Sequence, residues 1–378
     1  MQQPRRNTVL PIVLTVLVLL TALFFWLGAK LVYKHFAVPY FQDAAYNDLK
    51  AERYDSALEH TERLLELEPS DHTGHYNRGL ALVHYKRYAE AAASFRKAAE
   101  IQPEADSYLS LGYALEELNK HQEAVDCYDQ ALKYNAKDIR IYINKGIAYK
   151  YLNKPKDAIA CFDQALKLDP NDIAALEGKG TLLKNTEHYQ EACECFARIL
   201  DFPTEDYYPY ESMGYCLSAL GKHQQALSYL NKAISLKSDE ASTYEYKAYA
   251  LSQLGRHKEA RALIDQAIAL NRDAAQTVDF LMTQQDILFQ QKDYLAVRKV
   301  CSKIIAIDNK HANAYYNRAC AAALLKRPLA EILPDLQAAF KLDPKLAKWA
   351  ATDPDLASLR QEPDFRRLTD RRPTAATS

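Results

Sequence analysis

Histidines and cysteines are the residues of this sequence whose types and spacing could do chemistry, because both bind metal ions and cysteine is also a nucleophile. His72 and His75, with His84 further along, form the only histidine cluster that could coordinate a metal. No Gly-rich phosphate loop, G-x-S-x-G or H-E-x-x-H motif occurs in the sequence. We therefore predict no catalytic residue, no metal site and no cofactor.

The cysteines indicate repetition rather than chemistry. Cys127, Cys161 and Cys195 recur at intervals of 34 residues, and Cys193 forms a C-x-C pair with Cys195 that has no second pair nearby. Helices that pack about 8–10 Å apart would hold equivalent cysteines beyond disulfide reach, so we predict that they fill space on second helices of a repeat. An odd total of seven cysteines favours a reducing environment.

The overall charge is balanced. The 48 basic and 49 acidic residues leave a formal charge of -1, so no whole-chain field would attract nucleic acid. The sequence therefore predicts no nucleic-acid partner, and it shows no motif for a small-molecule substrate.

Two phase-locked series of small residues run through the chain. Intervals of 33 or 34 residues separate the alanines Ala91, Ala124, Ala158, Ala192, Ala226 and Ala260. The same intervals separate the glycines Gly79, Gly112, Gly146, Gly180 and Gly214. Bulky residues such as Phe95, Tyr128 and Phe162 follow the alanines by four positions, which places them on the same helical face. The pattern predicts two helices per unit, with small residues where backbones cross closely.

Residues 139–172, IRIYINKGIAYKYLNKPKDAIACFDQALKLDPND, contain one whole unit. Its order of aromatic, small, small, aromatic, alanine and proline over 34 positions resembles the tetratricopeptide repeat, and the resemblance covers roughly residues 38–344. It implies an all-α, right-handed α-solenoid of about nine helical hairpins. The expected units are 38–71, 72–104, 105–138, 139–172, 173–206, 207–240, 241–274, 278–311 and 312–344.

The two ends of the chain are expected to differ from this array. A short basic tail at 1–8 precedes a charge-free stretch at 9–29, which is long enough for a single transmembrane signal-anchor helix, and 30–37 would be a linker. A cleaved secretory signal is the alternative for 9–29, and the flanking charges leave the side of the membrane open. Residues 345–369 are expected to form capping helices in which Trp349, Leu356, Leu359 and Phe365 cover the last apolar face, and 370–378 a disordered tail. The sequence thus predicts a single-pass protein of a bacterial cell membrane.

In the family that the sequence resembles, first helices line a concave groove that binds other proteins. This implies that Glu177, Glu211 and Glu245, each following the aromatic site of a first helix, face a bound segment, although they could instead form a solvated face. The same face would carry Tyr113, Tyr215 and Tyr249, and it would become basic near Arg140 and Lys150. A peptide with Lys or Arg between apolar side chains would suit the acidic part.

The resemblance implies a non-catalytic scaffold that is tethered to a membrane and assembles an envelope complex. A docking receptor or co-chaperone that delivers clients to a translocase or chaperone is the alternative. Family members that bind chaperone tails use a basic and asparagine clamp across three units, and only Asn77 of this chain matches that clamp.

Overall fold

The computed structural model describes residues 9–271 and 273–369, and within these ranges the chain forms helices and turns without a strand. The chain divides into two compact units, the first ending at Lys179 and the second beginning at Gly180, both within one helix. The prediction of an all-α fold is confirmed for the described part of the chain. The predicted tails at 1–8 and 370–378 lie outside the described residues.

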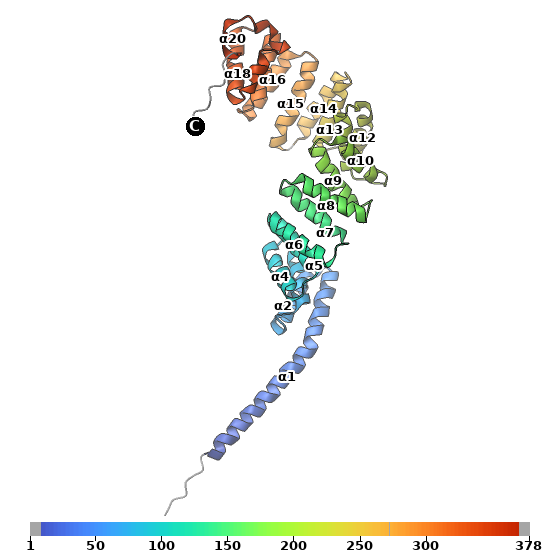
Figure 1. Cartoon of the computed structure of the whole chain (residues 1–378), viewed down its shortest axis with the longest axis vertical. Helices are drawn as coiled ribbons and strands as arrows, with labels where there is room; N and C mark the ends of the chain where they lie inside the picture. Colours follow the sequence, from blue (N-terminus) through green and yellow to red (C-terminus); the bar gives the residue numbers. More distant parts are fainter. Residues whose placement is uncertain (1–8, 272, 370–378) are drawn as a thin grey trace, which may run out of the picture. The chain divides into compact units, whose positions relative to one another are not determined.

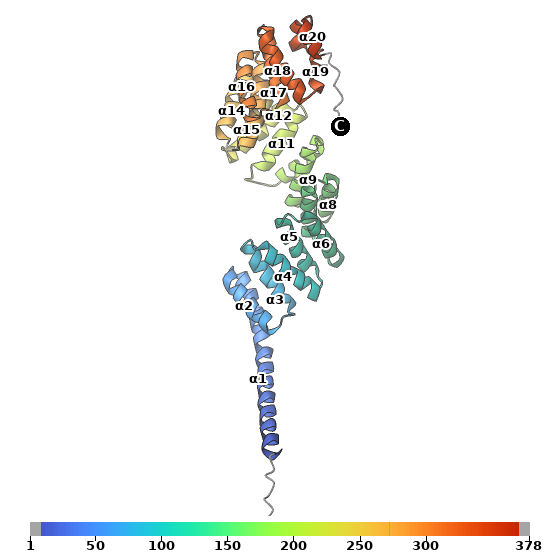
Figure 2. The same ribbon diagram turned by 90° about the vertical axis from the view of Figure 1, so that its left-hand side faces the viewer.

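Figures 1 and 2 show the succession of helices in the two units. The first unit contains α1 (Val9–Lys50), α2 (Tyr54–Leu67), α3 (His72–His84), α4 (Tyr88–Ile101), α5 (Ala105–Glu117), α6 (His121–Tyr134), α7 (Ile139–Tyr151), α8 (Pro155–Leu168) and the start of α9 (Ile173–Asn185). The second contains the rest of α9, then α10 (Tyr189–Leu200), α11 (Tyr208–Ala219), α12 (His223–Leu236), α13 (Ala241–Gln253), α14 (His257–Leu270), α15 (Ala274–Gln290), α16 (Tyr294–Ile307), α17 (Ala312–Leu324), α18 (Leu329–Leu342), α19 (Lys345–Ala350), η1 (Pro354–Leu359) and α20 (Pro363–Thr369).

Neighbouring helices pair as hairpins, as in α3 with α4, α5 with α6 and α13 with α14. We call the odd-numbered helices from α1 to α17 first helices and the even-numbered helices from α2 to α18 second helices. In the second unit α11 also contacts α13, and α13 contacts α15, so these first helices lie side by side. The surface that they share is called the first-helix face below.

Close packing inside the hairpins explains the periodic small residues. A Cβ atom on Gly112 would lie 2.4 Å from a ring carbon of Tyr128, and one on Gly79 would lie 2.5 Å from a ring carbon of Phe95. Both rings are fully buried. A Cβ atom would also lie 2.9 Å from Phe162 at Gly146 and 2.5 Å from Leu230 at Gly214, and the approach is looser at Gly180, where the nearest atoms lie 3.1 Å away. All six periodic alanines of the second helices have no exposed surface: Ala91, Ala124, Ala158, Ala192, Ala226 and Ala260.

The turns inside the hairpins share one backbone feature that the sequence reveals only in part. Gly221 and Gly255 have φ values of +75° and +76°, in the left-handed region that favours glycine. Equivalent turn positions in seven other hairpins carry non-glycine residues with φ between 54° and 64°: Glu52, Lys86, Asn119, Asn153, Glu187, Lys292 and Lys326. The left-handed turn conformation therefore recurs in each of these hairpins, even where the turn residue is not a glycine.

The structure contradicts two predictions, the transmembrane helix at 9–29 and the membrane localisation. Among the described residues, no helix is long and apolar enough to cross a membrane. The predicted span ended at Ala29, whereas α1 continues without a break through the predicted linker at 30–37 to Lys50.

The C-terminal part of α1 is instead the first helix of the first hairpin. It packs against α2, with Ala45 fully buried and Asp48 only 5% exposed. Asp48 accepts hydrogen bonds from Arg53 Nη2 at 2.6 Å and lies 2.8 Å from His60 Nδ1. The start of the array is thus continuous with the long N-terminal helix.

The elements after α18 cover the end of the second unit. Leu346, Leu356, Leu359 and Phe365 are buried in one cluster with side chains of α17 and α18. Trp349, which was predicted to cover the same face, is 63% exposed. Its indole stacks on the ring of Tyr316 with centroids 6.1 Å apart, and the stack places it at the edge of a cavity rather than in the core.

Candidate partner-binding site

Glu211 does not present its carboxylate to a bound segment, contrary to the prediction. The residue is 5% exposed, and its Oε2 accepts a hydrogen bond from Thr243 Oγ1 at 2.5 Å. The hydroxyl of Ser242 donates to the same carboxylate at 3.4 Å. Burial raises the pKa of Glu211, while the hydrogen bond from Thr243 opposes that rise. The physical reason for the correction is that a short hydroxyl on the next first helix reaches the carboxylate.

Glu245 is held in the same way one hairpin later. Its Oε1 accepts a hydrogen bond from Thr283 Oγ1 at 2.6 Å, and burial raises its pKa. These two bonds link α11 to α13 and α13 to α15. Glu177, on α9, is half-buried. Two of the three predicted groove acids therefore form hydrogen bonds to the next first helix, and so they do not form a freely solvated acidic face.

The predicted tyrosines are more accessible than the acids. Tyr249 is 44% exposed and Tyr113 is 38% exposed. Tyr215 is partly buried between Tyr189 and Tyr246, with ring centroids 6.0 and 4.8 Å away, and burial raises its pKa to about 12. Tyr113 belongs to the first unit, whereas Tyr215 and Tyr249 belong to the second.

The two basic residues predicted for the groove lie on α7 in the first unit. Arg140 donates to Asp138 Oδ2 at 2.6 Å and to Asp106 Oδ1 at 2.8 Å, so its charge is already paired. The hydrogen bond from Arg140 lowers the pKa of Asp138. Lys150 is exposed, with its Nζ 5.8 Å from the ring centre of Tyr151.

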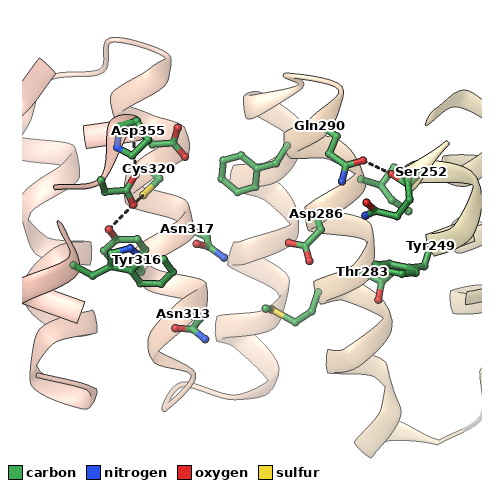
Figure 3. A pocket seen from close by; sticks show the side chains of 17 residues that line it. Tyr249, Ser252, Thr283, Asp286, Gln290, Asn313, Tyr316, Asn317, Cys320 and Asp355 are labelled. Carbon is green, nitrogen blue, oxygen red and sulfur yellow. Dashed lines mark hydrogen bonds between the residues drawn. The ribbon is translucent and has the colours of Figure 1, made fainter. Parts of the chain in front are cut away.

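A cavity of about 860 Å³ opens on the first-helix face of the second unit. Its walls come from α13, α15, α17, α19 and η1, so the C-terminal cap forms one side and three first helices form the rest. Figure 3 shows Tyr249 and Ser252 at one end, Tyr316 and Cys320 at the other, and Asp286, Asn313 and Asn317 between them. We call this cavity the cap pocket.

Hydrogen bonds and ring stacking give the two ends of the cap pocket a defined shape. Ser252 Oγ donates to Gln290 Oε1 at 2.5 Å, which joins α13 to α15. Tyr316 donates its hydroxyl proton to Asp353 Oδ2 at 2.6 Å and stacks on Trp349, which joins α17 to the cap. The walls are therefore held by contacts within the chain before any partner binds.

Most of the cap pocket was not anticipated from the sequence, although part of it could have been. Asp286 lies 37 residues after Tyr249, which is one repeat of 34 plus residues 275–277, the three residues between the predicted units 241–274 and 278–311. Extending the register of Tyr215 and Tyr249 across that insertion would have placed Asp286 on the same face. The contribution of the cap carried no such signal, because residues 345–369 have no counterpart in the repeat.

The histidines considered for chemistry each contact groups other than one another in the structure. His72 Nε2 lies 3.0 Å from Ser107 Oγ and 2.9 Å from Glu104, and the ring of His84 stacks on Tyr54 at 3.7 Å. His75 Nε2 bonds the carbonyl oxygen of Pro69 at 2.9 Å. Across the described part of the chain, no group of three or more His, Cys, Asp or Glu side chains could hold a metal ion.

The repeated cysteines are packing residues in the second helices. Cys161 and Cys195 are 8% and 6% exposed, and Cys127 is partly buried. Burial raises the pKa of the Cys127 and Cys161 thiols to about 11. A thiol with such a pKa is almost entirely protonated at neutral pH, so neither cysteine is a good nucleophile.

Stacked helical hairpins with a periodic small-residue core define a helical-repeat protein whose accessible feature is a surface along its first helices. Sequence profiles of the tetratricopeptide repeat match residues 43–106, 105–138, 139–172 and 213–275, just over half of the chain. The chain belongs to the tetratricopeptide repeat family, which confirms the resemblance found in the spacing. Repeats of this family are in general protein-interaction modules without catalytic activity.

Solved structures of similar fold have low sequence identity to this chain. A chain of the APC/C hetero-tetramer Cut9-Hcn1 is 15% identical, with a TM-score of 0.52 over 83% of this chain and 59% of its own. PilF of Pseudomonas aeruginosa is 18% identical, with a TM-score of 0.50 over 57% of this chain and 98% of its own. At such identities the likeness shows the fold alone. No curated protein sequence matches the chain.

Proposed function

We propose that this protein is a non-catalytic interaction scaffold that binds a segment of a partner protein on the first-helix face of its second unit. The cap pocket is the observation that carries the proposal. A cavity of about 860 Å³ is within the range of about 300–1,000 Å³ that is typical of ligand-binding pockets, and its walls combine aromatic rings with amides and carboxylates. The predicted role in an envelope complex depended on the membrane helix and is withdrawn with it.

The preformed walls support binding over a purely structural role for this face. The contacts between Ser252 and Gln290 and between Tyr316 and Asp353 order both ends of the cap pocket in the free protein. Order that exists before binding reduces the entropy that a partner must lose when it docks. A helical-repeat protein also gains stability from its core contacts alone, so an open, polar and aromatic cavity is not needed for folding.

Site-specific photo-crosslinking tests this proposal. A benzophenone amino acid would replace Tyr249, which is 44% exposed and lines the cap pocket, in the full-length protein expressed in its own cells. The matched control carries the same group at Ile307, which is 52% exposed at the end of the second helix α16. We expect discrete crosslinked proteins from position 249 and none of these from position 307. Identical products at both positions, or none at position 249, would contradict the proposal.

A further inference from the structure

We propose that the cap pocket recognises an arginine side chain of the partner segment, through the negative charge of Asp286 and Asp355 and the open indole of Trp349. This inference rests on the proposed function, because it names the chemistry that the binding surface selects.

The charge of the cap pocket is the first support. Its lining contains the carboxylates of Asp286, Asp353 and Asp355 but no lysine or arginine. Asp353 is committed to the chain itself, since Oδ2 accepts from Tyr316 and Oδ1 accepts from the backbone N–H of Asp355. The lining is therefore complementary to a positively charged group.

The other two carboxylates have few partners within the chain. Asp286 accepts one side-chain hydrogen bond, from Gln285 Nε2 at a long 3.3 Å. The carboxylate of Asp355 receives none from any residue that the structure describes. Asp286 is exposed, although the surrounding protein desolvates its carboxylate enough to raise its pKa, and burial together with the nearby Asp353 raises the pKa of Asp355. Each carboxylate would thus be better stabilised by an added cation than it is in the free protein.

The arrangement of these acids suits an extended cation better than a metal ion. A metal needs several ligands converging on one point at about 2.0–2.6 Å, and no such group exists among the described residues. Asp286 comes from α15 and Asp355 from η1, and Figure 3 shows them well apart in the cap pocket. A guanidinium needs no such convergent set, because its five N–H donors can pair with one carboxylate while the other adds negative charge to the pocket.

Trp349 distinguishes arginine from lysine. The indole is 63% exposed although it stacks on Tyr316, so part of its π surface stays open to a ligand. A planar guanidinium stacks on an aromatic ring, whereas a lysine ammonium is a compact and strongly hydrated charge. The open indole beside unpaired carboxylates therefore favours arginine.

The amides of Asn313 and Asn317 indicate that the arginine belongs to a polypeptide. They lie four residues apart on α17, so both line the cap pocket on one helical face, about 6 Å apart along the helix. Neither side chain bonds another described residue, and each amide offers both a donor and an acceptor. An extended peptide repeats its backbone groups about every 6.6–6.8 Å on one side, which matches this spacing.

Intrinsic fluorescence provides a direct test, because the chain has only two tryptophans, Trp26 and Trp349. In full-length protein carrying Trp26→Phe, Trp349 becomes the sole tryptophan reporter and already lies in the cap pocket. The probes are pools of acetylated, amidated heptapeptides with mixed alanine, valine, serine and glutamine flanks. The central residue is arginine, lysine or citrulline, which has nearly the shape of arginine without its charge.

We expect the arginine pool to change Trp349 fluorescence saturably, and the citrulline pool to bind at least about tenfold more weakly. The lysine pool should fall between them. Asp286→Asn and Asp355→Asn should each weaken arginine binding by about tenfold. Asp364→Asn, a matched change at an exposed aspartate of α20, should leave it unchanged.

Two outcomes would overturn the inference in distinguishable ways. Equal binding of arginine and citrulline pools would remove the arginine assignment while leaving peptide binding in place. No response of Trp349 to any pool would also refute it, and the photo-crosslink at position 249 would then decide separately whether a partner occupies this face. Unchanged helicity of each aspartate variant, measured by circular dichroism, excludes unfolding as the cause of any loss.

Discussion

Replacement of Glu211 by lysine should destabilise the second unit strongly, although the position looks like a surface site in the repeat register. The hydrogen bond from Thr243 to this charged acceptor is of a kind that contributes about 1.5–3 kcal/mol. A lysine at this position, where Glu211 is 5% exposed, would place an ammonium beside hydroxyl groups and near Lys184. Leaving a buried charge without its partner costs about 3–5 kcal/mol, and we expect a loss of that size in the free energy of unfolding.

Urea denaturation followed by Trp349 fluorescence measures this loss, because Trp349 lies in the second unit. The Trp26→Phe background removes the other tryptophan signal. Glu194→Lys, a charge reversal at an exposed site of α10, is the matched control and should change stability by no more than about 0.5 kcal/mol. Glu211→Gln keeps an acceptor oxygen for Thr243 and removes the buried charge, so it should lose far less than Glu211→Lys. Similar midpoints for Glu211→Lys and Glu194→Lys would refute the assigned burial.

Three further changes test the packing, a titration and the turns, each by denaturation. Gly112→Ala should lower the free energy of unfolding by about 1–2 kcal/mol, because overpacking against the buried ring of Tyr128 exceeds the gain in helix propensity. Gly28→Ala is the control and should not destabilise the protein, because a Cβ atom there would have no neighbour within 4 Å. Equal effects of the two changes would contradict the packing. Burial raises the pKa of Glu116 to about 7, so the folded protein holds this proton more tightly than the unfolded chain, and stability should fall as pH rises from about 4.5 to about 7. Glu116→Gln should flatten that fall, and an unchanged pH profile would contradict the shift. Lys86→Gly should stabilise by about 0.5–1 kcal/mol and Gly221→Ala should destabilise by about as much, because both turns have positive φ; changes of the opposite sign would refute this.

The core of the repeat could be predicted because packing acts directly on residue size. A glycine that faces a ring across a hairpin cannot become larger without moving that ring, as the 2.4 Å approach of a Cβ on Gly112 to Tyr128 shows. The same requirement returns in each hairpin, so it appears in the sequence as a fixed interval. The all-α class was predicted from that interval, and the family was predicted from the resemblance of the whole 34-residue pattern to the tetratricopeptide repeat.

The accessibility of the first-helix face could be predicted only in part. Register places Glu211 and Tyr249 on this face, but it does not say which side chains neighbouring helices will engage. Thr243 and Thr283 lie on the following first helices, and their hydroxyls bind the two predicted acids, while Tyr249 stays 44% exposed. The prediction for Glu211 was wrong because hydrogen bonding between hairpins depends on distances that spacing along the chain does not contain.

By itself, the sequence determined that this chain is a tetratricopeptide repeat protein, because steric demands that recur every hairpin leave a periodic record of small and large residues. Only the tertiary structure decided where a partner could bind. It showed that α1 continues through residue 29, that Glu211 and Glu245 link neighbouring first helices, and that the cap closes one end of a pocket. These features arise from contacts between elements that are far apart in the chain, and such contacts leave no periodic pattern in the sequence.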